Sequence, residues 1–156
     1  MVISPLFSDK IAIMIDNTCG EDYDFACLTC AENGLLHRIK MSKNVYYDIK
    51  RGKPYARMIL LHELGHYFQN HHLVQNKQRD KERSELVSNG KLSEEELKAD
   101  AFAVEFLGIK IVERGLEELY ALIDIEYKQQ ENCDASLTLR ELNMRREKLL
   151  TQSKKT

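Results

Sequence analysis

The 156-residue sequence contains little glycine or proline, seven and two residues respectively, and no tryptophan. So low a content of glycine and proline excludes collagen-like and low-complexity chains. Hydrophobic residues make up 43% of the chain and charged residues 31%, which is typical of a globular protein rather than a disordered one. A chain of this length commonly forms one domain. We therefore expect a single domain over residues 1–152, with a frayed tail at 153–156.

The sequence also lacks an excess of charge of either sign and any long hydrophobic run. Lys and Arg number 23 and Asp and Glu number 25, so bulk charge predicts no direct binding to nucleic acid or to an anionic membrane. Apolar stretches such as residues 102–112 are too short or too interrupted by charge to cross a bilayer. The first residues, MVISPLFSDK, do not place an apolar segment after a basic one. We expect no signal peptide and a cytoplasmic location.

Cysteine is too scarce for a disulfide scaffold, with four residues at positions 19, 27, 30 and 133. Cys27 and Cys30 have the spacing of half a zinc knuckle or of a redox pair. No second pair with that spacing follows, so we interpret these two thiols as core filling on a helix. The sequence assigns no role to Cys19 or Cys133.

Hydrophobic periodicity and capping residues predict a helix-rich α+β chain with a small N-terminal sheet. Strands are expected over residues 10–15, 35–41 and 45–49, and helices over residues 21–33, 54 to about 74, 93–107 and 112–150, the last with a weak point at 132–135. The polar run at 76–91 is expected to be a solvated connection.

The segment His62-Glu63-Leu64-Gly65-His66 indicates metal chemistry. Residues four apart lie on one face of a helix, so the two imidazoles can bind one ion, with Zn²⁺ expected. Glu63 lies beside that face, where a carboxylate can take a proton from metal-bound water. The alternative is a pair of surface histidines, which the apolar residues around the motif disfavour. Gly65 costs a helix about 1 kcal/mol relative to alanine, which is easier to understand if another part of the site packs closely there.

A catalytic zinc needs a third protein ligand, and we favour Glu96. Asp100 lies one turn after Glu96 and could accept a hydrogen bond from one histidine, fixing the orientation of its ring. Ser93 and Glu96 also match a capping box, in which Glu96 would only satisfy the helix N-terminus. Glu94 and Glu95 are competing ligands, but neither has an acidic residue four positions later.

His72 is the other candidate for the third ligand, because His62, His66 and His72 have the histidine spacing of the metzincins. That motif has glycine where this chain has Gln69, and the glycine lets the chain leave the helix. An uninterrupted helix would turn His72 away from His66. We therefore interpret His71 and His72 as exposed residues near a helix end.

The run YARMILLHELGHYFQNHH, followed some thirty residues later by EELKADAFAVEFL, resembles the ImmA/IrrE family of zinc metallopeptidases. The second part of that family's pattern, E-x-x-A-(N/D)-x-F-A, is matched by Glu96, Ala99, Asp100, Phe102 and Ala103. The resemblance implies a compact zincin-like α+β fold and a cytosolic endopeptidase with His62, His66 and Glu96 as zinc ligands. It also implies a protein substrate, either a helix-turn-helix repressor of a phage or mobile element or a stress regulator.

Other features leave alternatives open. The predicted strand at 45–49 is either an edge that holds substrate or an ordinary core strand. Tyr67, His37 and Tyr47 are candidates for stabilising the oxyanion. The basic C-terminal residues at 140, 145, 146, 148, 154 and 155 alternate with acids and indicate a solvated helix face. The alternative function is a non-catalytic, metal-binding module that sequesters a regulator.

Overall fold

The structure is a computed structural model, which describes residues 2–5, 11–15, 26–29, 37–69, 76–129 and 135–154. Its helices are α1 (Lys43–Lys50), α2 (Pro54–Phe68), α3 (Asn76–Ser88), α4 (Glu94–Leu107), α5 (Ile109–Gln129) and α6 (Ser136–Lys154). Its strands are β1 (Val2–Pro5), β2 (Ile11–Ile15), β3 (Ala26–Thr29) and β4 (His37–Met41). The prediction of a helix-rich chain is confirmed.

The four short strands pair in the order β1-β2-β4-β3. Strand β2 pairs in parallel with β4, and the two outer pairs are antiparallel. Strands β2 and β4 coincide with the strands expected over residues 10–15 and 35–41. The predicted helix over residues 21–33 is wrong, because Ala26–Thr29 forms strand β3 against β4. Backbone pairing with a neighbouring strand overrode a weak local helix preference there.

The predicted strand over residues 45–49 is also wrong, because this segment is helix α1. The Ser42 hydroxyl accepts a hydrogen bond from the Val45 N–H at 3.3 Å and caps the helix. Val45 and Asp48 are buried, a spacing of three residues that fits a helix better than a strand. The Tyr55 hydroxyl of α2 donates to the Asp48 carboxylate and joins the two helices. The substrate-holding edge predicted at residues 45–49 is therefore excluded.

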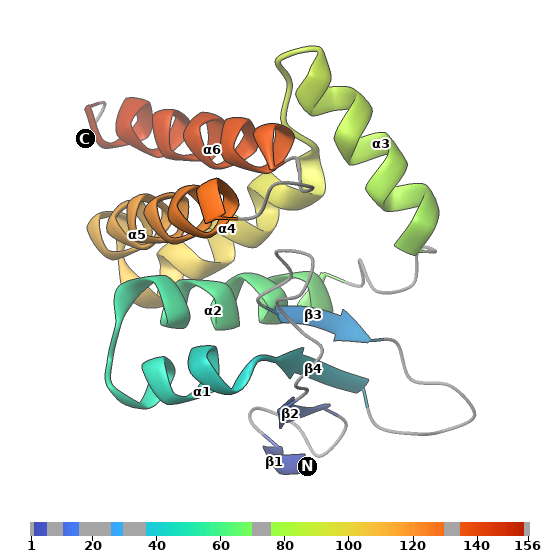
Figure 1. Cartoon of the computed structure of the whole chain (residues 1–156), viewed down its shortest axis with the longest axis vertical. Coiled ribbons are helices and arrows are strands. Elements are labelled where there is room, and N and C mark those ends of the chain that lie inside the picture. The colour runs from blue at the N-terminus through green and yellow to red at the C-terminus, as the bar shows by residue number, and fades with distance from the viewer. Residues whose placement is uncertain are drawn as a thin grey trace.

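Helix α2 lies between the sheet and helices α4, α5 and α6 (Figure 1). It begins at Pro54, as predicted, after a turn in which Gly52 has a φ of 79°. It ends at Phe68 rather than near residue 74, and the Gln69 side chain then donates to the Lys98 carbonyl of α4 at 3.1 Å. Strands β3 and β4 contact α2 on one side, and helices α4 and α5 contact it on another. This central position buries most of the helix.

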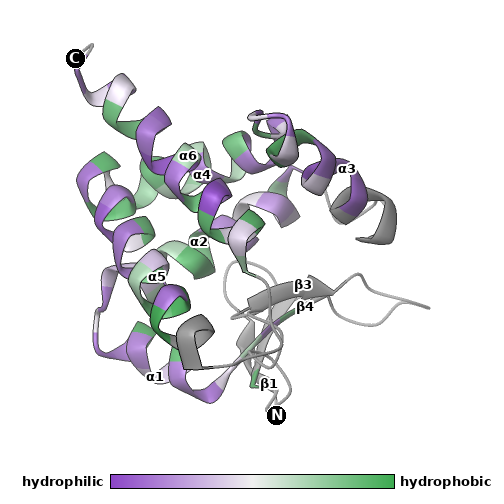
Figure 2. Cartoon of the chain, turned by 45° about the horizontal axis from the view of Figure 1, so that its top comes forward, coloured by the Kyte–Doolittle hydropathy of each residue, from purple (hydrophilic) through white to green (hydrophobic). Residues whose placement is uncertain are grey.

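The polar segment predicted to be a connection contains helix α3. Figure 2 shows α3 as mostly hydrophilic, and it stands at the side of α6 in Figure 1. Val87 is its one fully buried apolar side chain within the described part of this helix, at 2% exposure. The helix ends at Ser88 and is followed by Asn89 and by Gly90, which has a φ of 74°. Composition alone missed α3 because so little of it packs against the core.

The core lies between the α2 layer and helices α4, α5 and α6. Its fully buried large side chains include Met58, Leu64, Val112, Leu116 and Ile123. Gly108, with a φ of 89°, separates α4 from α5, so the helix predicted from residue 112 begins three residues earlier, at Ile109. Helix α6 continues to Lys154, into the segment predicted to be frayed. Within the described residues, no helix has the length and apolar content needed to span a membrane.

Candidate metal centre

The two histidines of the motif project from one face of α2 into the protein. His62 and His66 are 6% and 5% exposed, and their Nε2 atoms lie 3.1 Å apart. The rings meet edge to face, with centroids 4.7 Å apart. The helical spacing of four residues explains this convergence. The alternative of two surface histidines is therefore excluded.

Glu96 brings a carboxylate from α4 to the same point. Its Oε2 lies 2.8 Å from His62 Nε2, and its Oε1 lies 3.3 Å from His66 Nε2. The Ser93 hydroxyl does accept from the Glu96 N–H at 3.2 Å, as a capping box requires. The Glu96 side chain, however, faces the histidines and is 3% exposed. Capping by Ser93 thus fixes the start of α4 without using the Glu96 carboxylate.

These three side chains form a cluster that could hold a metal ion. One ligand atom from each of His62, His66 and Glu96 lies within 4.8 Å of the others. In the described part of the chain, His62 Nε2 is the group that faces the buried Glu96 Oε2, at 2.8 Å. When Nε2 carries no proton, that oxygen has no donor among the described residues, which is costly, and a cation between the two atoms would remove that cost. Two imidazoles and one carboxylate are also a donor set that binds zinc.

Asp100 lies one turn after Glu96 and contacts the outer nitrogen of His62. Its Oδ1 is 2.8 Å from His62 Nδ1. Arg145 of α6 donates to both oxygens of the same carboxylate, from Nη2 at 2.6 Å and from Nε at 2.8 Å. Both residues are buried, at 3% and 5% exposure. This arrangement directs the Nδ1 proton of His62 toward Asp100 and leaves Nε2 facing Glu96.

The charges around His62 shift the pKa values of the cluster. Burial opposes the charge on His62, but the Glu96 charge and the hydrogen bond to Asp100 outweigh it and raise the pKa of His62 to about 9. Burial also disfavours the Asp100 carboxylate, yet Arg145 lowers its pKa to about 2. The pKa of Glu96 is lowered as well, against its burial, by Arg83 and His62. The lowered pKa values therefore favour the charged form of both carboxylates next to His62, Glu96 and Asp100.

Arg83 connects helix α3 to the cluster. Its Nε donates to Glu141 Oε2 of α6 at 2.5 Å, and its Nη2 donates to Glu141 Oε1. Its Nη1 lies 3.5 Å from Glu96 Oε1. Glu141 is only 3% exposed, and Arg145 Nη1 lies 3.9 Å from it. Four helices therefore contribute charged or imidazole side chains to one connected network.

Gly65 lets α2 and α4 approach closely at the site, as its position in the motif predicts. A Cβ atom at this position would lie 3.0 Å from Ala99 Cα, 3.0 Å from Phe102 Cβ and 3.1 Å from the Ala99 carbonyl oxygen. Such contacts are tighter than ordinary van der Waals packing. A side chain at residue 65 would push α4, and Glu96 with it, away from the histidines.

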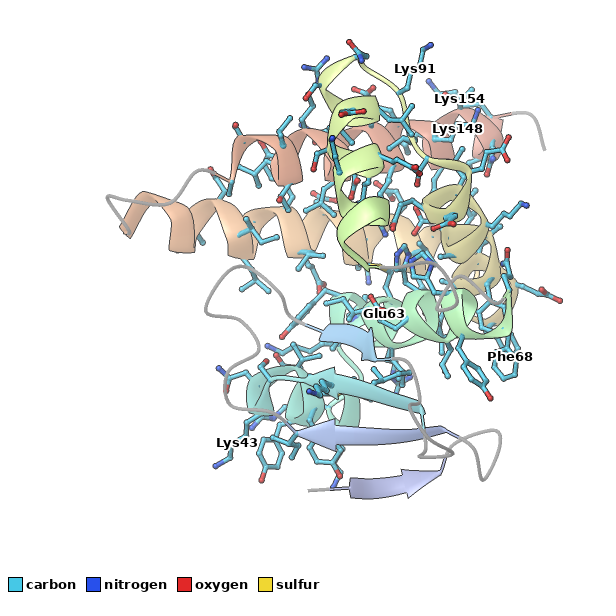
Figure 3. The ribbon with its side chains drawn as sticks, turned by 90° about the vertical axis from the view of Figure 1, so that its right-hand side faces the viewer. Lys43, Glu63, Phe68, Lys91, Lys148 and Lys154 are labelled. Carbon is cyan, nitrogen blue, oxygen red and sulfur yellow. The ribbon has the colours of Figure 1, made fainter. Side chains whose placement is uncertain are left out.

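Glu63 is half-buried beside the cluster on α2, which strand β3 contacts (Figure 3). It forms no hydrogen bond or ion pair with another described residue. Of the oxyanion candidates, Tyr67 packs edge to face with Phe68, and Tyr47 lies on α1, 41% exposed, beside Tyr46. The backbone of His37 is in β4. None of the three is placed at the metal cluster by a described contact.

Several predictions concern residues whose position is not described. His71 and His72 lie outside the described residues, as do Cys19, Cys30 and Cys133. Cys27 belongs to strand β3, so its assignment to a helix is wrong.

The sequence prediction missed the residues that surround the ligands. The charge pattern predicts a solvated face that includes Arg145 and Glu141, yet both are buried. Their spacing of four residues on one helix indicates a shared face, but nothing local shows that this face is buried. Arg83 stood in the segment predicted to be a connection. All three depend on long-range contacts that periodicity cannot reveal.

Comparison with family models, with curated proteins and with solved structures found no match for this chain. The geometry of the cluster is therefore the principal basis for assigning a function.

Proposed function

We propose that this chain is a zinc-dependent endopeptidase, with His62, His66 and Glu96 as ligands and Glu63 as the general base. The observation that supports this most directly is the buried cluster of two imidazoles and one carboxylate, with Glu63 next to it on α2. Three protein ligands leave one position for water or substrate, as in catalytic rather than structural zinc sites. The proposed fold is of the zincin type, in which the motif helix lies beside a small sheet.

The residues of the chain have distinct parts in the proposed reaction. Bound zinc would polarise the peptide carbonyl and make water acidic enough to lose a proton near neutral pH. Glu63 would accept the proton of the attacking water and pass it to the leaving amide nitrogen, so that the carboxylate returns to its starting state. Asp100, held by Arg145, would keep the His62 ring in the orientation that presents Nε2 to the ligand position.

The substrate is proposed from the resemblance to the ImmA/IrrE family, whose sequence pattern resembles the segments that form both helices of the cluster, α2 and α4. A cytoplasmic protein of that kind would cleave a transcriptional regulator, without binding nucleic acid or membrane itself. In the sheet formed by the described residues, β3 is an outer strand and α2 contacts it, which supports a protein substrate, since an extended peptide could pair with such a strand.

The test combines metal analysis with cleavage by three variants. Elemental mass spectrometry should find one zinc per chain in the wild type and in Glu63→Gln, and a sharp loss in Glu96→Ala. New protein N-termini should appear when the wild type is added to a lysate of its source cells, and should be absent with Glu63→Gln. Glu94→Gln is the matched control, because Glu94 is exposed on the same turn as Glu96.

Unchanged cleavage by Glu63→Gln would exclude Glu63 as the base. Zinc binding without any cleavage by the wild type would instead favour the non-catalytic module that sequesters a regulator.

A further inference from the structure

We infer that Arg83 is the anion-binding residue of this site, positioned to receive the carbonyl oxygen of the substrate as it gains negative charge. The inference rests on the proposed function, because it assumes that a peptide carbonyl is polarised at the cluster. It assigns a catalytic part to a residue of α3, a helix that lies outside the motif pattern.

The first support is the way the guanidinium is held. Nε and Nη2 of Arg83 both bind the Glu141 carboxylate, in the fork-to-fork arrangement that fixes an arginine in one orientation. Glu141 is itself buried and lies near Arg145. A group fixed in advance loses little entropy when it binds a ligand, and this is the property that an oxyanion-stabilising residue requires.

The second support is the direction in which the remaining nitrogen faces. Nη1 lies 3.5 Å from Glu96 Oε1, and that oxygen lies 3.3 Å from His66 Nε2. Arg83 thus lies near the proposed ligand Glu96, which also faces the two histidines. A substrate carbonyl would be placed in that region.

The third support is the access of Arg83 to a ligand. Its side chain is 36% exposed, whereas the ligands His62, His66 and Glu96 are buried. A guanidinium has five N–H donors, and the hydrogen bonds of Arg83 to described residues use Nε and one N–H of Nη2. Among the described residues, no hydrogen bond uses Nη1 or the second N–H of Nη2, and these donors could serve an anion. A residue that only joined α3 to α6 would need the two hydrogen bonds to Glu141. It would not need a nitrogen close to the Glu96 carboxylate.

In the proposed step, water adds to the peptide carbonyl next to Arg83. The water oxygen bonds to the carbonyl carbon, its proton goes to Glu63, and the π-electron pair of the carbonyl moves onto the carbonyl oxygen. Arg83 would donate hydrogen bonds to that oxygen without accepting or releasing a proton, since an arginine stays charged throughout. The charge on the oxygen is larger after addition than before it, so the contact favours the reaction.

Arg146 supplies a matched control for the test. It has the same 36% exposure and is also paired with carboxylates, with Nε 2.9 Å from Glu113 and Nη2 3.6 Å from Glu117. None of its described contacts is with the metal cluster. Arg146→Met and Arg83→Met therefore each remove an arginine of equal exposure that has two acidic partners. The two variants differ in that Arg83 lies near the metal cluster.

The experiment measures the affinity of inorganic phosphate for the zinc-loaded chain by isothermal titration calorimetry. Phosphate can offer one oxygen to the ion and another to a guanidinium. We expect Arg83→Met to weaken phosphate binding at least about tenfold, from the loss of a charge-assisted hydrogen bond, while one zinc per chain is kept. Arg83→Lys, which keeps the charge but not the fork, should lie between wild type and Arg83→Met. Arg146→Met should bind phosphate as the wild type does.

The outcomes separate this inference from the proposed function. Equal phosphate affinity in zinc-loaded wild type, Arg83→Lys and Arg83→Met would overturn the role of Arg83 and leave the zinc site standing. Failure of the zinc-loaded wild type to bind phosphate would also overturn the role of Arg83 and leave the zinc site standing. Absence of zinc from the wild type would overturn both. Where cleavage is measurable, a fall in kcat with little change in KM in Arg83→Met would support the inference, and a change in KM alone would contradict it.

Discussion

His62 lies between two carboxylates. Asp100 contacts its Nδ1 and Glu96 lies next to its Nε2, so two carboxylates from one helix face the two sides of one ring. With a pKa of about 9, the ring is protonated at neutral pH when no metal is bound. A metal ligand must have lost that proton, which means that metal and proton compete for Nε2.

We predict that zinc uptake at pH 7 releases about one proton from His62. Zinc affinity should rise by about tenfold per pH unit up to about pH 9 and then level off as His62 becomes neutral. Calorimetric titration in two buffers of different ionisation enthalpy measures the released proton. Asp100→Asn removes one of the charges that raise this pKa, so it should release fewer protons. Equal release by both proteins would contradict the assignment.

In the metal-free protein the raised pKa of His62 also affects folding stability. Its contribution is complete below the unfolded value of 6.5 and is lost as pH rises through about 9. The contribution of Asp100 to folding stability depends on pH in the opposite direction. Its pKa is lowered to about 2 from 3.8, so this contribution is lost as pH falls through that range. Metal-free protein should therefore be most stable between about pH 4 and 6.5 with respect to these two groups.

At the scale of helices and strands, the close contact between α2 and α4 determines whether the ligands meet. Gly65 allows that contact, and Gly115 allows a similar one between α2 and α5, where a Cβ would lie 3.0 Å from Met58 Cβ and from the Pro54 carbonyl oxygen. Both glycines thus serve close packing rather than an unusual backbone angle. Their surroundings differ in that only Gly65 lies between the two histidines.

We predict that Gly65→Ala lowers the free energy of unfolding by about 1–3 kcal/mol through overpacking, after the gain in helix propensity. It should also weaken zinc binding, because α4 and Glu96 are displaced. Gly115→Ala is the control and should lose comparable stability while keeping its zinc. Urea unfolding with parallel metal analysis measures both effects. A Gly65→Ala protein with normal zinc affinity would show that α4 can shift without moving Glu96.

The helices of the cluster could be predicted from the sequence because their signals are local. Pro54 and Ser93 mark the starts of α2 and α4, and the spacing of His62 and His66 places both rings on one face. Helices α1 and α3 and strand β3 could not be predicted in the same way. The β-branched and aromatic residues of α1 suggested a strand, α3 is nearly all polar, and β3 depends on pairing with β4.

The same distinction applies to the site itself. Glu96 and Asp100 share a helix face, so their joint approach to the histidines follows from spacing once two helices are assumed to pack together. Arg83 lies between the ligands in sequence, but its partner Glu141 and the residue Arg145 come from α6, so these contacts depend on how α3 and α6 pack. Long-range packing of this kind is not encoded in a local pattern.

At the scale of the whole molecule, the cluster joins the middle of the chain to its last helix. His62 and Asp100 are 38 residues apart, and Arg145 follows Asp100 by 45 residues. Breaking one partner of a buried ion pair costs about 3–5 kcal/mol, because the other charge stays buried without compensation. The site and the packing of α2, α4 and α6 are therefore mutually dependent.

We predict that zinc removal by a chelator lowers the Tm of the wild type and that the Tm rises with free zinc concentration. At a zinc concentration one hundred times Kd, the stabilisation is about 2.7 kcal/mol. Differential scanning calorimetry with and without chelator measures the shift. Glu96→Ala should have the same Tm in both conditions. A zinc-dependent Tm in that variant would point to binding elsewhere on the chain.

The distance along the chain between Asp100 and Arg145 also has a consequence for biosynthesis. During translation, α2 and α4 leave the ribosome before α6, so His62 and Asp100 are both exposed before the guanidinium that compensates Asp100 has been added. Until residue 145 emerges, the carboxylate would have to remain in water, and α4 could not settle fully on α2. The order of synthesis thus delays assembly of the cluster of His62, His66 and Glu96 until the last helix of the chain is in place.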